Sequence, residues 1–223
     1  MKVALIQDAI EKLKETLRRQ KLANDFAYKY RNLHHFINQW DIEAIDLSTM
    51  YRNAFTSSVS ERLWGGNRNS AKSAMVSMIA LQKEFIRVMF KDLFNESKDL
   101  NMRVNRFLFH CDQIRREINK SKEILTDHYH TSKMASLYLA FEYPNCYTIL
   151  EPEEFCHFLE LVECKNIPLE GEFERHVKLT RGIFKLMERD EELVELYKTH
   201  VLDDTGLDFN MLAVHDLYSN TIQ

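Results

Sequence analysis

The chain has 223 residues, of which 45% are hydrophobic and 29% charged, and its formal net charge is −4. This composition is typical of a globular protein with a buried core, and it excludes collagen-like, low-complexity and wholly disordered chains. Only five residues are glycine and three are proline, a shortage that disfavours turn-rich sheets and favours helices joined by short polar connections.

Apolar residues recur at three- and four-residue steps along most of the chain, which predicts amphipathic helices. The first helix covers 3–17, a second or continuing helix extends to Trp40, and a third covers 42–55. Small and polar residues at 57–70 and 120–131 predict loops. The remaining predicted helices cover 71–81, 82–94, 98–119, 134–141, 151–163, 171–188, 190–200 and 209–219.

One short segment has a β-like composition. Residues 146–150 read CYTIL, which is β-branched and aromatic but too short to form a sheet alone. We therefore predict an all-α fold, an irregular bundle of about ten helices with at most this one β-like segment. No linker forces a split, so residues 1–223 are expected to form one helical domain, with subdivision conceivable at 1–60, 70–142 and 151–220.

The chain carries no sign of a membrane or secretory protein. No uncharged apolar run approaches the roughly 18 residues of a membrane span, and acidic residues interrupt the apolar pattern of the first 20 residues. The four cysteines are too sparse for a disulfide framework. These features predict a cytoplasmic protein with reduced thiols.

Enzyme signatures are missing from the sequence. It contains no Walker A or G-x-G-x-x-G glycine pattern, no G-x-S-x-G elbow and no H-E-x-x-H. Cys156 and Cys164 are eight residues apart, whereas structural zinc sites use closer pairs. The D…E-x-K pattern at 92–98 resembles a nuclease metal site but lies between predicted helices rather than on strands. We therefore expect no catalytic residues, no metal site and no cofactor.

Charge is distributed unevenly along the chain. Residues 1–141 hold 23 Lys and Arg against 16 Asp and Glu, whereas residues 142–223 hold 7 against 18. Arginines in the central segment can each donate two hydrogen bonds to a DNA phosphate, although a solvated helix face together with a flexible loop is the simpler explanation. The predicted DNA contacts are Arg68, Lys72, Arg103, Arg106, Arg115, Arg116 and Lys120.

Aromatic residues at helical spacing allow two interpretations. They either pack in the core or line a pocket for an extruded base, which is read by stacking and by hydrogen bonds to its edge. The residues concerned are Tyr28, Tyr30, Phe36, Trp40, Tyr138, Phe141, Tyr143 and Tyr147.

Four segments together resemble a known protein group. They are QWDIEAID at 39–46, MFKDLFNESKDL at 89–100, SLYLAFEYPNCYT at 136–148 and RDEEL at 189–193. In this order and spacing they resemble the N-terminal helical region of bacterial McrB-like AAA+ proteins, the motor subunits of modification-dependent restriction systems. The resemblance covers about residues 25 to 218.

The resemblance implies a role in anti-phage defence. In McrB-like proteins this region precedes an NTP-hydrolysing module, selects the DNA target, and belongs to a ring that recruits an McrC-like nuclease. Because the chain lacks the Walker A sequence, no nucleotide-binding residue carries over. The leading hypothesis is a non-catalytic DNA-targeting module whose acidic C-terminal third faces the AAA+ motor. The alternative is a protein-interaction or oligomerisation module that does not bind DNA.

Overall fold

The computed structural model describes residues 1–64, 70–121, 125, 127–169 and 171–222. It confirms the all-α prediction, since these residues form eleven α-helices and no strand. None of the described helices is both long enough and apolar enough to cross a membrane. In chain order the helices are α1 (Val3–Arg18), α2 (Gln20–Gln39), α3 (Leu47–Ala54), α4 (Glu61–Trp64), α5 (Ala71–Leu93), α6 (Leu100–Ser121), α7 (Ser132–Glu142), α8 (Pro152–Leu161), α9 (Phe173–Met187), α10 (Glu191–His200) and α11 (Leu212–Ile222).

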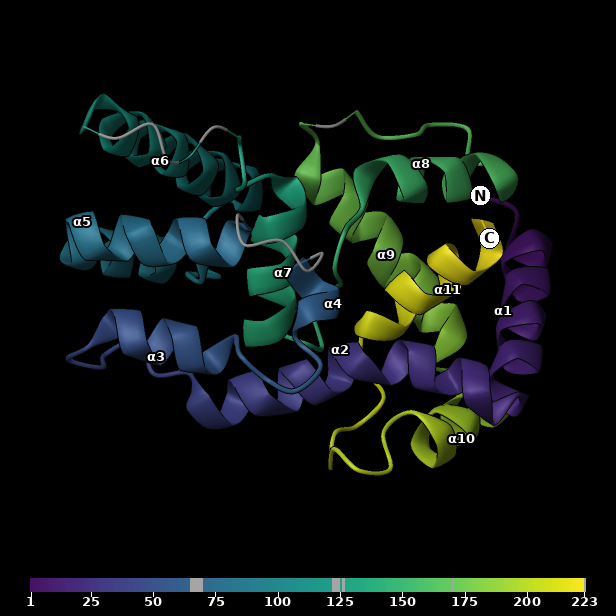
Figure 1. Cartoon of the computed structure of the whole chain (residues 1–223). Helices are drawn as coiled ribbons and strands as arrows, with labels where there is room; N and C mark the ends of the chain where they lie inside the picture. The colour runs from purple at the N-terminus through teal and green to yellow at the C-terminus, as the bar shows by residue number, and fades with distance from the viewer. Residues whose placement is uncertain (65–69, 122–124, 126, 170, 223) are drawn as a thin grey trace.

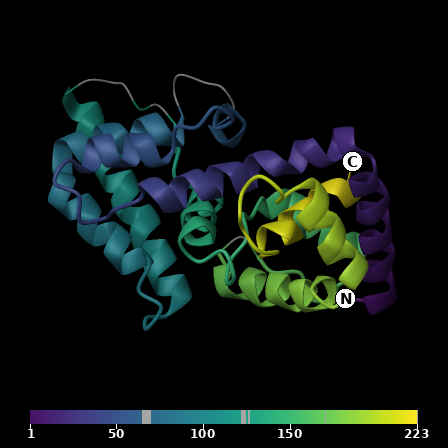
Figure 2. The ribbon, with the colours of Figure 1, turned by 90° about the horizontal axis from the view of Figure 1, so that it is seen from below.

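The helices form two groups that share α2 (Figures 1 and 2). In one group α3 and α6 pack against α5, and α7 packs against α6. In the other group α1 packs against α10 and α11, and α8 packs against α11. The long helix α2 contacts members of both groups. Helices α1 and α3 therefore lie in different groups, and α2 contacts both of them.

Amphipathic spacing explains how single helices join this core. On α1 the apolar side chains of Ile6, Ile10, Leu13 and Leu17 are all buried, as expected for one helical face. In the other group, aromatic rings fill the space between α3, α5 and α7. The Tyr138 ring meets the Phe90 ring edge-on at 5.1 Å between centroids.

Helix α5 has the break that the sequence predicts. Separate helices were expected at 71–81 and 82–94; the structure has one element, Ala71–Leu93, in which Gln82 leaves the helical region with φ −138° and ψ 56°. Ser70 begins the helix with a capping box shared with Ser73, which satisfies backbone N–H groups that the first turn leaves unbonded.

The helix expected at 42–55 begins later than predicted. Helix α3 starts at Leu47 because the Asp46 carboxylate caps it, accepting from the Thr49 backbone N–H at 3.0 Å. The residues before it are not helical, and their carbonyls, including that of Ala44 at 2.9 Å, accept hydrogen bonds from the buried Arg87. The loop predicted at 57–70 also contains the four-residue helix α4.

Residues 147–150 are buried, follow a turn that ends at Cys146, and have no regular secondary structure, and the described residues include no strand with which they could pair. Side chains from helices take the place of a strand partner. The Leu150 N–H donates to Ser136 Oγ at 2.8 Å, and the Ile149 carbonyl accepts from the Tyr218 hydroxyl at 3.0 Å. The segment with β-like composition is therefore a buried connection between helices. It forms no sheet because its neighbours are helices, which have no strand edge for it to pair with.

Candidate functional site

A polar cleft of about 530 Å³ lies beside α2 and is lined by residues of α1, α2, α4, α7, α8 and α11 and of the segment before α8. We call it the α2 cleft. Its volume falls within the usual range of small-ligand sites. Charged side chains of both signs line it, together with two aromatic rings and one histidine. The lining residues used below are Asp25, Phe26, Tyr28, Lys29, Arg62, Lys133, Glu151, Glu154 and His215.

A buried ionic cluster forms the floor of the α2 cleft. Lys29 on α2 is 2% exposed, and its ammonium contacts the carboxylate of Asp216 on α11, which is 0% exposed. The second carboxylate oxygen of Asp216 accepts from the hydroxyls of Tyr30 at 2.9 Å and Tyr197 at 3.0 Å. Burial lowers the pKa of Lys29 and raises that of Asp216, while their mutual attraction opposes both shifts.

Lys29 also determines the chemistry of His215. Its ammonium lies 2.8 Å from His215 Nδ1; an ammonium can only donate, so Nδ1 is the acceptor and the ring proton is on Nε2. Burial, and then the charge of Lys29, hold the pKa of His215 well below its usual value. The imidazole therefore stays neutral and presents an N–H donor. It has no free lone pair with which to act as a general base.

Aromatic rings surround the cations of the cleft. The Lys29 ammonium lies 5.7 Å from the Phe26 ring centroid and 5.5 Å from that of Tyr28. The guanidinium of Arg62 on α4 stacks over the Tyr28 ring at 4.3 Å. Burial, and then the charge of Asp216, raise the pKa of Tyr28 to about 12. Tyr28 thus remains a neutral hydroxyl, and the stacked pair offers a flat surface to a planar ligand.

One carboxylate in the cleft, that of Glu154, lies in the field of Lys133 and Lys29 but makes no ion pair with a described residue. Glu151 pairs with Lys133, and Asp25 pairs weakly with Arg62 at 3.4 Å. No hydrogen bond or ion pair joins the Glu154 carboxylate to another residue that the structure describes. Burial, and then the neighbouring charge of Glu151, raise the pKa of Glu154. The cleft thus combines a spare acceptor with the His215 N–H donor and a flat stacking surface.

Arg103, predicted as a DNA contact, is instead a core residue. Its side chain is 2% exposed. The guanidinium donates to the Leu93 carbonyl at 2.6 Å and the Tyr147 hydroxyl at 2.8 Å, and it pairs with Glu96 at 2.5 Å. A phosphate cannot reach it without displacing these buried bonds, so the prediction for Arg103 is corrected. A charged side chain is expected at the surface unless the fold supplies buried hydrogen-bond or ion-pair partners, as it does for Arg103.

The other residues predicted to contact DNA differ in their exposure and in their partners. Lys72 donates to Thr56 Oγ1 at 2.8 Å and is partly buried. Arg106 is exposed and pairs with Asp92 at 2.9 Å. Arg68 lies outside the described residues.

Three predicted contacts lie near the C-terminal end of α6. Arg115 and Arg116 share the carboxylate of Asp112, at 2.8 and 2.7 Å. Lys120 is exposed in the last turn of α6. The structure therefore brings these three residues together in the last two turns of α6, whereas Arg103 and Arg106 lie nearer the start of that helix and Lys72 lies on α5.

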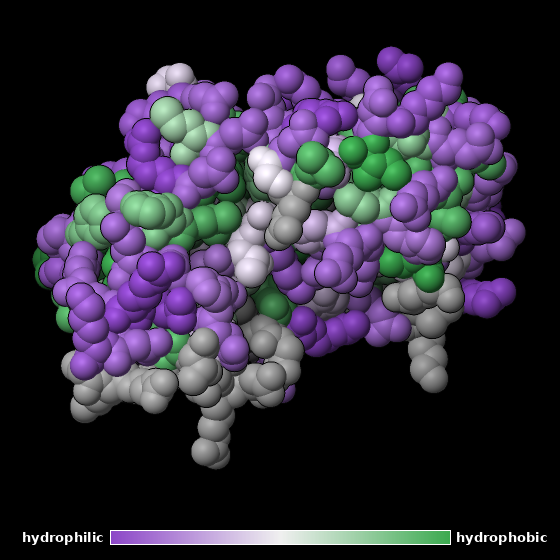
Figure 3. Space-filling view, turned by 90° about the horizontal axis from the view of Figure 1, so that it is seen from above, coloured by the Kyte–Doolittle hydropathy of each residue, from purple (hydrophilic) through white to green (hydrophobic). Residues whose placement is uncertain are grey.

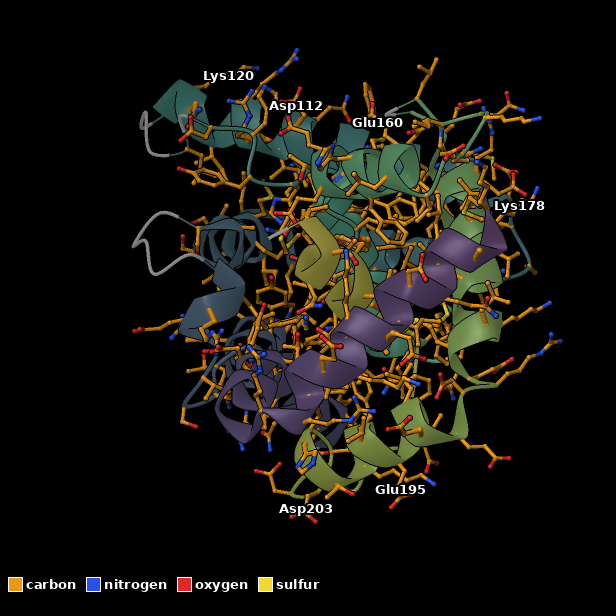
Figure 4. All side chains as sticks on the ribbon, turned by 90° about the vertical axis from the view of Figure 1, so that its right-hand side faces the viewer. Asp112, Lys120, Glu160, Lys178, Glu195 and Asp203 are labelled. Carbon is orange, nitrogen blue, oxygen red and sulfur yellow. The ribbon has the colours of Figure 1, made fainter. Side chains whose placement is uncertain are left out.

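Acidic residues lie at both ends of the molecule. Figure 4 shows Lys120, Asp112 and Glu160 at one end and Glu195 and Asp203 at the opposite end. In the described part of the chain, no three His, Cys, Asp or Glu side chains gather as they would to hold a metal ion.

The sequence analysis did not identify the α2 cleft, although Tyr28 was among the aromatic candidates. Its polar residues come from six helices, and Lys29 and Asp216 are 187 residues apart in sequence. The adjacent His215 and Asp216 within the buried, mainly apolar first part of α11 were an available signal, because polar pairs there need buried partners. Comparison with protein-family models, curated proteins and solved structures gives no match to this chain.

Proposed function

We propose that this chain is a non-catalytic targeting module of an McrB-like restriction factor, and that the α2 cleft holds one nucleotide of its DNA target. The observation that carries the proposal is the combination of an unpaired Glu154 carboxylate, a neutral His215 donor and the Arg62–Tyr28 stack in one cleft. The resemblance of four sequence segments to McrB-like proteins supports the restriction context.

The groups in the cleft complement a nucleobase that carries an amino group beside a ring acceptor. Such a base stacks on the Arg62–Tyr28 pair, as extruded bases stack on side chains in other proteins. Glu154 accepts from the amino group, and the His215 N–H donates to the ring acceptor. Cytosine and adenine have this arrangement. A flanking phosphate would compete with Glu151 for Lys133, the α7 lysine that lines the cleft.

The absence of a free base at His215 supports a binding role over a catalytic one. In the proposed assembly, Arg116 and Lys120 at the end of α6 add phosphate contacts outside the cleft. The acidic surface at the opposite end, marked by Glu195 and Asp203 (Figure 4), faces the AAA+ motor. That motor and an McrC-like nuclease are the proposed partners, and the proposed location is the cytoplasm.

Removing the charge of Glu154 is expected to weaken DNA binding. Glu154→Gln replaces one acceptor oxygen with an amide donor, and we expect at least a tenfold higher Kd. The measurement is fluorescence anisotropy with unmodified and cytosine-methylated duplexes that contain one mismatched cytosine, from about 50 to 200 mM salt. Glu153→Gln is the matched control because Glu153 is exposed like Glu154 and lies in the same helical turn, but it does not line the α2 cleft; its Kd should equal that of the unmodified protein.

Two results would contradict this proposal. One is an absence of binding to any duplex at about 50 mM salt, where phosphate contacts are strongest. The other is binding that Glu154→Gln and Glu153→Gln leave equally unchanged, which would place the DNA outside the α2 cleft.

A further inference from the structure

Selection of one base over another at the α2 cleft has to come from groups inside it. Figure 3 shows one face of the molecule, on which hydrophilic side chains predominate between smaller hydrophobic patches. Such a surface can contact a DNA backbone, but phosphate contacts carry no information about the base. Within the cleft, His215 can present either a donor or an acceptor, depending on which ring nitrogen carries the proton.

One ring nitrogen of His215 is left for a ligand. The residue lies on α11, is 9% exposed and lines the cleft. Its Nδ1 lies 2.8 Å from the Lys29 ammonium, whereas no hydrogen bond joins Nε2 to another residue that the structure describes. The imidazole also packs against the Tyr218 ring, at 5.0 Å between centroids. These two contacts hold the ring in place, and Nε2 is the atom that can meet a base.

The buried cluster behind His215 keeps Lys29 protonated. The ammonium contacts the Asp216 carboxylate, which also accepts from the hydroxyls of Tyr30 at 2.9 Å and Tyr197 at 3.0 Å. Three donors on one carboxylate oppose the effect of burial and favour its charged form, and that negative charge favours the ammonium. Because an ammonium has no lone pair, Nδ1 of His215 accepts and Nε2 carries the proton while this cluster is intact.

The bases differ in the ring nitrogen that His215 would meet. In cytosine and adenine the ring nitrogen beside the amino group is an acceptor, whereas in guanine it carries a proton. The amino group of each can donate to Glu154, and thymine has no amino group. Guanine would bring its ring N–H against the His215 N–H, and two opposed donors are both left without a partner.

We propose that Lys29 is a specificity-determining residue of the α2 cleft, because it holds His215 in the tautomer that accepts cytosine or adenine and rejects guanine. This inference rests on the function proposed above. Lys29 acts through His215 and needs no contact with the base, so it is a positioning residue. The choice of base is then made by the buried cluster of α2, α10 and α11 and not by the outer surface.

Two bases isolate the ring nitrogen experimentally. 2-Aminopurine and guanine carry the same amino group, but the adjacent ring nitrogen is an acceptor in 2-aminopurine and a donor in guanine. Each base is placed opposite an abasic-site analogue in the same duplex, so that neither is paired, and Kd is measured by fluorescence anisotropy with the full chain. We expect the 2-aminopurine duplex to bind about tenfold more tightly or better.

Removing the ammonium and its counter-charge together tests the role of Lys29. In Lys29→Met/Asp216→Asn either ring nitrogen of His215 can carry the proton, so the preference for 2-aminopurine should fall to about threefold or less. Tyr51→Phe is the matched control, because it removes a buried hydrogen bond, that between Tyr51 and Tyr138 at 2.7 Å, in the other group of helices. This control should keep the full preference.

The protonated ring nitrogen can be identified directly by nuclear magnetic resonance. Long-range proton–nitrogen correlation spectra distinguish the two tautomers, and the His215 signals are assigned by their loss in His215→Gln. In the unmodified protein Nε2 should carry the proton and Nδ1 should not. The double variant should lose this single tautomer, a change that a merely structural role of Lys29 would not produce.

Four results would overturn the inference. The first is a proton on Nδ1 of His215 in the unmodified protein. The second is equal Kd values for the two duplexes while Glu154→Gln still weakens binding, which would leave the proposed site standing. The third is a double variant that keeps both its circular dichroism spectrum and the full preference. The fourth is unchanged binding by Glu154→Gln, which overturns the proposed function as well. The spectra and the two duplexes need no folded double variant.

Discussion

Replacing Asp216 with alanine is expected to lower the free energy of unfolding by about 3–5 kcal/mol, the usual cost of removing one partner of a buried ion pair. The physical reason is that Lys29 would keep a buried charge with no counter-ion. The hydroxyls of Tyr30 and Tyr197 would also lose their common acceptor. Urea unfolding followed by circular dichroism measures the effect.

Two variants show whether the loss comes from the unpaired charge. Lys29→Met/Asp216→Asn removes both charges and keeps an oxygen for the tyrosine hydroxyls, so it should destabilise less than Asp216→Ala. Glu163→Gln breaks the exposed Lys2–Glu163 pair and should cost less than about 1 kcal/mol. If Asp216→Ala were no more costly than Glu163→Gln, the buried cluster would not be part of the stabilising core.

Acidification from pH 6.5 to pH 4 is expected to destabilise the protein strongly. Burial lowers the pKa of His130 from 6.5 to about 4, so in this window the unfolded chain binds a proton that the folded chain does not. Stability therefore rises with pH here and is lost as pH falls. A difference of about 2.5 units corresponds to roughly 3 kcal/mol. Burial and Lys29 shift the pKa of His215 in the same direction.

Unfolding free energies at several pH values test this prediction. In His130→Gln the residue no longer titrates, so the fall in stability between pH 6.5 and 4 should shrink by up to about 3 kcal/mol, whatever the variant's stability at pH 7. His157 is exposed on α8, and His157→Gln should follow the unmodified protein. Parallel curves for all three proteins would show that protonation of His130 is not linked to unfolding.

The periodicity of apolar residues was sufficient to predict most helices. It located the interruption of α5 at Gln82 and placed α10 within one residue of its observed start, where Asp190 caps the helix by accepting from the Leu193 N–H at 2.9 Å. These features depend on neighbours within four residues in the chain. The prediction for 42–46 was wrong because the Arg87 side chain, 43 residues away from Ala44, holds that segment out of a helix.

Long-range contacts explain why the predicted basic residues have such different environments. Arg103 and Arg106 are three residues apart on α6, yet one is buried and the other exposed. The Tyr147 hydroxyl and Glu96 draw Arg103 inwards, whereas the partner of Arg106 is Asp92 at the surface. The local sequence therefore could not predict that Arg103 is buried and Arg106 exposed, because the composition and spacing around the two arginines are alike.

The sequence alone determined that this is a helical protein without recognisable catalytic motifs, because helix formation depends on side chains three and four residues apart. Only the tertiary structure decided which charges are neutralised inside the core and which remain for a ligand. A buried charge must find a partner wherever the fold provides one, and here α2 and α11 bring Lys29 to Asp216 across most of the chain. The same packing of α2 against α11 created the α2 cleft, which no local pattern encodes.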